Sequence, residues 1–442
     1  MGPVRQQSLS VIEGLSDLYD LTVIFVLLNA VVVWMLLIAI ASPTLLLAVG
    51  LSLLVFNMSW LGEDGMGLAF LLAGVGTSTL AVVKSFSSRR GQLPVPRLLQ
   101  LPLCVGTAGL LLSLLAEDPA DAASVSAGLV LMGWLLIQAL TNIPAREVGN
   151  AVFSAVTFAS LLSLLTIVLS VEQDNHFGRS VGVFENPNQL GMMSGLWCVL
   201  ALSRRRAWVV VVPIALTIIV LSDSRGSLFA TTVAIVGWLW MGGTSIRPRR
   251  TRYLLTTRMM VTLFLGALVL GLSSLMGQAV GSIDSGVLRA SDSGRIELLQ
   301  IGLERFAQRP FAGWGLGTER IEGVLQPHLL PLSMGVQLGI VGLVISAISI
   351  VLLVSIMKER DPGLVAIALF GLVSMLFEAW LFGTGNMTAW GFWFGLGAIL
   401  VVVTSGEDSD SMRDTHTNSF EASRGKHEPD SQRSIPQSFP LS

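Results

Sequence analysis

Three residues with reactive or anion-binding side chains, Arg225, Arg295 and His328, each stand at the border of a long apolar run. Guanidinium groups bind phosphate oxygens through paired hydrogen bonds and stabilise charge that develops on a leaving group. An imidazole accepts or donates a proton near neutral pH. This set suits a reaction at an anionic, doubly phosphorylated substrate, with both arginines on the leaving group and the histidine on the attacking group.

The local setting of each residue allows a functional and a structural interpretation. Arg225 follows Ser224 in a very short turn between apolar runs, where an arginine could also simply reach lipid headgroups. Arg295 stands in the first turn of a predicted amphipathic helix, and a helix N-terminus and a guanidinium hold the same anion. His328 lies just before a predicted membrane helix, where a lone histidine is commonly a structural hydrogen-bonding group.

A polar, turn-rich segment at 178–191 interrupts the apolar sequence and contains Arg179, Asn186 and Asn188. Irregular chain next to membrane helices is expected where the backbone meets water or lines a site. Glu378 lies near the outer end of a predicted span, where a carboxylate pairs with a cation, lines a water-filled cavity or reaches interfacial water. These residues are therefore candidates for substrate binding.

The composition is that of a membrane protein. The chain has 442 residues, of which 52% are hydrophobic and 13% charged, whereas soluble domains carry about 25% charged residues. The net charge of −2 does not indicate binding of nucleic acid. No Cys/His cluster has metal-ligand spacing, so we expect neither a metal nor another cofactor, and we interpret Cys104 and Cys198 as packing residues.

The apolar runs predict an all-α, polytopic integral membrane protein with about 12–13 transmembrane helices. The candidate spans are 21–41, 44–61, 66–83, 98–115, 123–141, 148–170, 189–203, 207–222, 226–243, 259–280, 332–356, 363–382 and 386–404. Loops rich in lysine and arginine alternate with acidic loops, which places the basic loops in the cytoplasm. The side of the N-terminus depends on whether the first hairpin spans the membrane.

This sidedness divides the chain into four parts. We expect transmembrane helices over 1–170, a core over 171–345 with a large external loop at 281–331, further transmembrane helices over 346–404, and a disordered cytoplasmic tail over 405–442. The external loop is predicted to contain the amphipathic helix that begins near Arg295. Arg179, Arg225, Arg295 and His328 then all lie toward the external face.

The order of short motifs over roughly 175–345 resembles that of the O-antigen ligase and polymerase family, membrane glycosyltransferases that use polyprenyl-linked sugars. The matching residues are Arg179, Gly182, Phe184, Asn186, Pro187 and Asn188, then Ser224 and Arg225, then Arg295, then Pro310, Gly313, Gly315 and Gly317, and finally His328 with Gly339, Ile340 and Gly342. Leu329 and Gln337 stand where the family usually has an asparagine and a glutamate. These two departures bear on which acceptor is used more than on the reaction.

The resemblance implies transfer or polymerisation of glycan from a polyprenyl-pyrophosphate-linked donor to an acceptor hydroxyl, without a metal, in cell-surface polysaccharide biosynthesis. It implies Arg225, Arg295 and His328 as catalytic residues and Arg179, Asn186, Asn188 and Ser224 as substrate-binding residues. Glu378 joins the substrate-binding candidates on its position alone, since it could offset an external arginine or orient His328. The implied partners are membrane lipids, a glycan or lipid acceptor and other envelope-polysaccharide assembly proteins. The implied location is the inner (plasma) membrane, with the site on the external face.

Other functions remain open from sequence. A ligase and a polymerase are not separated. A transporter of a small anion such as bicarbonate is the alternative, although it should place ionisable residues or broken helices near the bilayer midplane. A non-catalytic scaffold for envelope-glycan assembly would not need the three catalytic candidates to converge.

Overall fold

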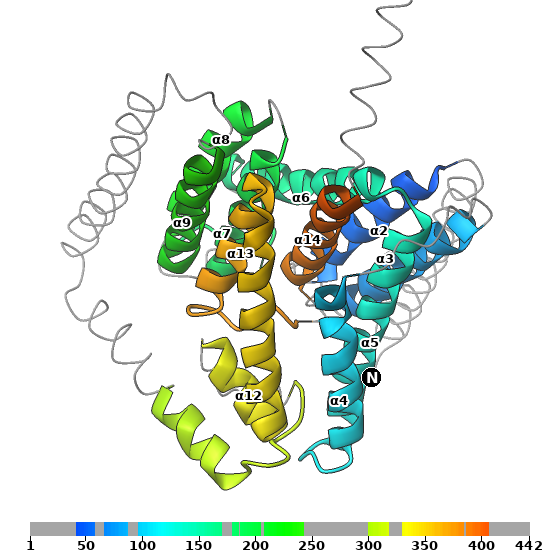
Figure 1. Ribbon diagram of the computed structural model, residues 1–442, viewed down its shortest axis with the longest axis vertical. Helices are drawn as coiled ribbons and strands as arrows, with labels where there is room; N and C mark the ends of the chain where they lie inside the picture. The colour runs from blue at the N-terminus through cyan, green and yellow to red at the C-terminus, as the bar shows by residue number, and fades with distance from the viewer. Residues whose placement is uncertain are drawn as a thin grey trace, which may run out of the picture.

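The structure, a computed structural model, describes residues 41–57, 66–86, 96–169, 179–184, 186–204, 207–242, 299–317, 329–383 and 386–405. Its regular secondary structure is helical, which confirms the all-α prediction (Figure 1). The α-helices are α2 (Pro43–Asn57), α3 (Met66–Ser85), α4 (Leu101–Ser113), α5 (Pro119–Asn142), α6 (Ala145–Val168), α7 (Pro187–Leu202), α8 (Ala207–Leu221), α9 (Arg225–Gly242), α12 (Leu330–Ile356), α13 (Pro362–Ser374) and α14 (Met387–Ser405). Short 3-10 helices are η3 (Arg97–Gln100) and η6 (Met357–Glu359), and residues 299–308 form a further helical segment.

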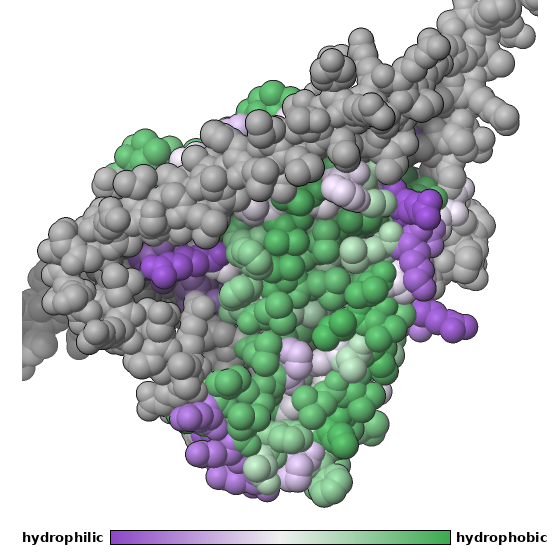
Figure 2. Space-filling view, turned by 60° about the vertical axis from the view of Figure 1, so that its left-hand side comes forward, coloured by the Kyte–Doolittle hydropathy of each residue, from purple (hydrophilic) through white to green (hydrophobic). Residues whose placement is uncertain are grey.

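By length and composition, four of the described helical stretches could cross a membrane: Pro119–Asn142, Ala145–Val168, Leu330–Glu359, which bends at Gly339, and Met387–Ser405. This confirms a polytopic membrane protein. The predicted span 259–280, nearly all of 21–41 and all of the predicted tail after Ser405 lie outside the described residues. Figure 2 shows the lipid-compatible character directly, as a broad hydrophobic face bordered by hydrophilic residues.

Several helices begin at a capping side chain followed by proline. Asn186 caps α7, Asp118 caps α5 and Asp361 caps α13, and in each case the side chain accepts a backbone N–H of the first turn. Proline at the first helical position has no N–H to leave unbonded and already has a helical φ. These caps explain why the helices start one to four residues before the apolar runs used to predict them.

The predicted span 363–382 is too long, because α13 ends at Ser374. The chain after it is irregular but apolar, and Trp380, Leu381 and Phe382 in it are buried. The indole Nε1 of Trp393 donates to the Leu381 carbonyl at 2.8 Å. Irregular backbone near membrane helices is stable where protein covers it, so hydropathy alone could not distinguish this segment from helix. Glu378 consequently lies beyond the helix and not within it.

Helix α7 lies at the centre of the bundle, and almost every one of its residues is buried. It packs against α6, α8, α9, α13 and α14. Gly191 allows the close approach of α9, because a Cβ there would lie 2.7 Å from the Ser224 hydroxyl oxygen. Small residues at such crossings bring the backbones of membrane helices together. The start of α7 is thereby held beside the turn that precedes α9.

Helix α12 folds back on itself at Gly339, whose φ of 62° and ψ of −145° are not helical. Gly342 packs against the Met334 carbonyl, and a Cβ on Gly335 would lie 3.0 Å from a methyl group of Leu343. Residues eight apart in a continuous helix are separated by about 12 Å. The contacts therefore require two helical arms, 330–338 and 340–356, joined by a sharp bend.

The loop at 310–317 closes this bend with its own backbone. Trp314 and Gly315 donate their N–H groups to the carbonyls of Val336 and Gln337, and the Ile340 N–H donates to the Pro310 carbonyl at 2.7 Å. These bonds replace those that the helix loses at Gly339. The Pro-x-x-Gly-x-Gly and Gly-Ile-x-Gly motifs thus form one joint, which we call the α12 joint.

The α12 joint also contacts the connection between α4 and α5. The Glu117 N–H donates to the Trp314 carbonyl at 3.1 Å, and Leu316 is buried. The Arg309 guanidinium stacks on the Trp314 ring at 4.3 Å from its centroid. Three separate regions of the sequence are therefore joined at this end of the molecule.

Candidate active site

Arg179 caps the end of α8 from a distant part of the chain. Its Nε donates to the Ser222 carbonyl at 3.0 Å, and its Nη2 donates to the Asp223 carbonyl at 3.0 Å. The Ser180 N–H donates to the Leu221 carbonyl at 3.2 Å. The last carbonyls of a helix have no intrahelical donor and carry partial negative charge, so a guanidinium is a favourable partner. Arg179 thereby fixes the turn between α8 and α9.

Asn188 connects this arginine to Glu378. Its Oδ1 accepts from the Arg179 Nη2 at 2.9 Å, and its Nδ2 donates to the Glu378 Oε1 at 2.8 Å. The amide thus joins a cation and a carboxylate, each of which is costly to desolvate without such partners. Residues 190 positions apart in sequence meet in this chain of hydrogen bonds. We refer to Arg179, Asn188 and Glu378 as the polar chain.

The turn held by the polar chain leaves Arg225 at the surface of the molecule. Asp223 has a φ of 46°, a left-handed conformation that aspartate tolerates better than most residues. Ser224 is buried, and its hydroxyl shares a 2.7 Å hydrogen bond with that of Ser227. Arg225 then begins α9 with 55% of its side chain exposed, and its Nε lies 4.0 Å from the Asp223 carboxylate.

Asn186 has a structural position in this arrangement. Its Oδ1 accepts the Asn188 N–H at 2.8 Å and so caps α7. Phe184 is buried, and Gly182 has a φ of 62° and packs against Ser163. The motif over 179–188 therefore folds a connection into the bundle and brings Asn188 to the polar chain.

Arg295 and His328 lie outside the described residues, so the structure brings together Arg179, Asn188, the 222–225 turn and Glu378 from the predicted set. The predicted amphipathic helix is helical over 299–308. Its Phe306 faces α12, since a Cβ on Gly335 would lie 3.4 Å from that ring. Leu299 and Leu303, which precede Phe306 at helical spacing, are exposed.

Residues 208–347 match the O-antigen ligase family. Over this range the match supports the resemblance of the chain to the O-antigen ligase and polymerase family. The match supports glycan transfer of the O-antigen ligase or polymerase type in general, by a glycosyltransferase-like enzyme in a membrane. No curated protein matches the chain.

The match to the O-antigen ligase family spans α8, α9 and the α12 joint. All three members of the polar chain lie outside the matched range, yet Arg179 bonds directly to the turn at 222–223 within it. The matched range is therefore completed by side chains from before α7, from the first turn of α7 and from after α13.

Sequence reasoning missed two aromatic residues next to Arg225. Phe229 and Phe377 place their ring centroids 5.8 Å apart with an interplanar angle of 73°. The spacing of four residues between Arg225 and Phe229 places both on one helix face and was available from sequence. The approach of Phe377 was not, because it depends on how the chain leaves α13.

Proposed function

We propose that the protein transfers glycan from a polyprenyl-pyrophosphate-linked donor to an acceptor hydroxyl on the external face of the inner membrane. The observation that carries this proposal is the exposed Arg225 guanidinium at the N-terminus of α9, on a turn held by Arg179. Backbone N–H groups at a helix start and a guanidinium favour the same anion. Pyrophosphate is such an anion, and it is the leaving group of this reaction.

Arg225 and Arg295 supply fixed positive charge as negative charge develops on the departing pyrophosphate. His328 accepts the proton of the acceptor hydroxyl or orients its oxygen for attack on the sugar. The C–O bond to the donor phosphate breaks as the new glycosidic bond forms, so lipid pyrophosphate leaves with the bonding electrons. The polar chain, Ser224 and Asn186 shape the donor site around this turn. No step in this mechanism requires a metal.

The backbone at the bend in α12 supports transfer over transport. A transporter uses the free carbonyls and N–H groups of a broken helix to bind its substrate. Here the Val336, Gln337 and Ile340 backbone groups at the bend bond to the chain at 310–315. We therefore do not propose transport of bicarbonate.

The test is reconstitution of the full chain in liposomes with a lipid-linked oligosaccharide and an acceptor, followed by analysis of product size. We expect metal-independent transfer, so that activity survives chelation. Arg295→Ala and His328→Ala should each lose about a hundredfold, as commonly follows removal of a transition-state donor or base. Arg320→Ala, in the same loop, serves as the control. Equal losses in Arg320→Ala and Arg295→Ala would indicate a general effect of loop charge.

A further inference from the structure

The Phe229 and Phe377 pair lies directly beside Arg225 and joins two elements. Phe377 reaches α9 because Gly226 has no side chain, and a Cβ there would lie 2.8 Å from the Cβ of Phe377. Its neighbour Glu378 belongs to the polar chain. The same short segment after α13 therefore places an aromatic ring on α9 and a carboxylate on α7.

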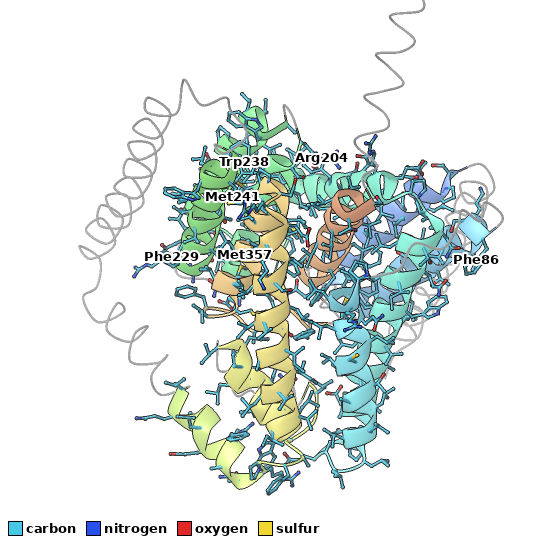
Figure 3. All side chains as sticks on the ribbon, in the orientation of Figure 1. Phe86, Arg204, Phe229, Trp238, Met241 and Met357 are labelled. Carbon is cyan, nitrogen blue, oxygen red and sulfur yellow. The ribbon has the colours of Figure 1, made fainter. Side chains whose placement is uncertain are left out.

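Phe229 is exposed on the same side as the guanidinium, and Phe377 is half-buried against Phe229. Phe229 follows Arg225 by one helical turn, so the two side chains lie on one face of α9. Phe229 is 49% exposed and Leu376, next to Phe377, is 58% exposed. Figure 3 shows Phe229 near the end of α9 opposite to Trp238 and Met241. A charged group and an apolar surface thus stand side by side.

The lengths of the surrounding helices place this surface short of the end of the molecule that α4 and α12 reach. Helix α13 has 13 residues, a length of about 20 Å, whereas the hydrocarbon core is about 30 Å thick. In Figure 1, α4 and α12 extend beyond the ends of α9 and α13. We therefore expect the Phe229 and Phe377 rings to be set back into the apolar depth of a membrane, next to the Arg225 guanidinium.

A ligand that fits both features carries a phosphate joined directly to an apolar chain. From this arrangement we infer that Phe229 and Phe377 bind the phosphate-proximal isoprene units of the lipid donor while Arg225 binds its pyrophosphate. The inference rests on the proposed function and names the part of the donor that the site recognises. Two rings at a steep angle form a ridge on which methyl-branched, unsaturated units pack, and packing against aromatic faces is favourable.

The first experiment compares two donors that carry the same glycan pyrophosphate, one on a polyprenyl chain and one on a saturated, unbranched alkyl chain. In Phe229→Ala and Phe377→Ala we expect the KM for the polyprenyl donor to rise about tenfold, the change that lost burial of a large apolar side chain commonly produces. The kcat and the KM for the alkyl donor should stay nearly constant. Phe229→Leu should retain part of the effect.

Trp240→Ala is the matched control, because Trp240 is an exposed aromatic residue on the same helix near its other end. It should leave both KM values unchanged. An unchanged KM for the polyprenyl donor in the phenylalanine variants would overturn the inference, as would an equal rise for both donors or the same rise in Trp240→Ala.

A second measurement separates this inference from the proposed function. A photoreactive polyprenyl phosphate should crosslink to the wild-type protein near Phe229, and less so to Phe229→Ala, whether or not glycan is transferred. Unlabelled polyprenyl phosphate should displace the probe and vesicles of phosphatidylglycerol should not. Displacement by both would show a general phospholipid contact. Wild-type protein that crosslinks without transferring glycan would refute the proposed reaction, but it would still support binding of polyprenyl phosphate at Phe229.

Discussion

Arg225 holds a position that its own helix does not favour. The positive end of the helix dipole lies at the first turn, where a cation costs about 0.3–1 kcal/mol. The described first turn of α9 contains no acidic residue, and the partner Asp223 is itself one-third exposed. Such an exposed pair stabilises the fold very little. An arginine that lowers the stability of its own helix and stays accessible is best explained by a role in binding an anion.

Arg225→Ala should therefore leave the thermal stability of the detergent-solubilised protein unchanged and lower glycan transfer by about a hundredfold or more. Arg225→Lys should restore only part of the activity, because an ammonium lacks the two-pronged geometry of a guanidinium. Melting temperature and initial rate, measured on the same preparations, check this. A marked fall in melting temperature would instead assign Arg225 a structural role.

Arg179→Ala should behave differently, because this side chain caps α8. The substitution leaves the carbonyls of Ser222 and Asp223 without the guanidinium, at a cost of about 1–3 kcal/mol for each group that becomes buried and unbonded. Both the melting temperature and the transfer rate should fall. If Arg179→Ala lost activity at full stability, direct contact with substrate would be the better interpretation.

At the scale of elements, the α12 joint determines how the chain at 299–317 meets the helix bundle. One arm of α12 starts beside the end of α13, where the Leu330 N–H donates to the Met375 carbonyl at 2.9 Å. The other arm begins at the joint with the chain at 310–317. The joint therefore links the helix at 299–308 to the elements that carry the polar chain. Its geometry depends on glycines with positive φ, namely Gly313, Gly315, Gly317 and Gly339.

Gly339→Ala should destabilise the protein strongly. A Cβ there would lie 2.6 Å from the Pro310 and Phe311 carbonyl oxygens, and φ is 62°, a conformation that costs about 1–3 kcal/mol for a residue with a side chain. Thermal unfolding in detergent measures the effect. Gly76→Ala is the control, since a Cβ at Gly76 meets no atom within 4 Å. Comparable melting temperatures for the two variants would contradict the proposed rigidity of the joint.

At the scale of the whole molecule, the sidedness of the basic loops decides whether the site faces the external compartment. We expect the loops at 84–97, 203–206 and 244–258 in the cytoplasm and residues 281–331 outside. Single-cysteine variants at Arg320 and Arg250, treated with a membrane-impermeant thiol reagent, test this. Labelling should mark position 320 and spare position 250. The reverse result would place Arg225 and its neighbours on the wrong side for the proposed reaction.

The sequence by itself determined the class of molecule and most of its helices. Apolar length, the scarcity of charge and the proline and asparagine signals at helix starts act locally, so they are readable without neighbours. The glycine motifs around 313 and 339 were also visible in the sequence, although their structural role in the α12 joint was not. The boundary of α13 was missed because residues 375–383 are as apolar as a helix and are stable only under the cover of α14.

Only the tertiary structure decided which of the predicted residues contact one another. Arg179 and Glu378 were each isolated polar residues in sequence, and Asn188 links them because the starts of α7 and α9 meet the end of α13. Phe377 reaches α9 for the same reason. A desolvated charge or ring can pair only with side chains whose backbones approach it closely. That approach depends on contacts between residues far apart in the chain.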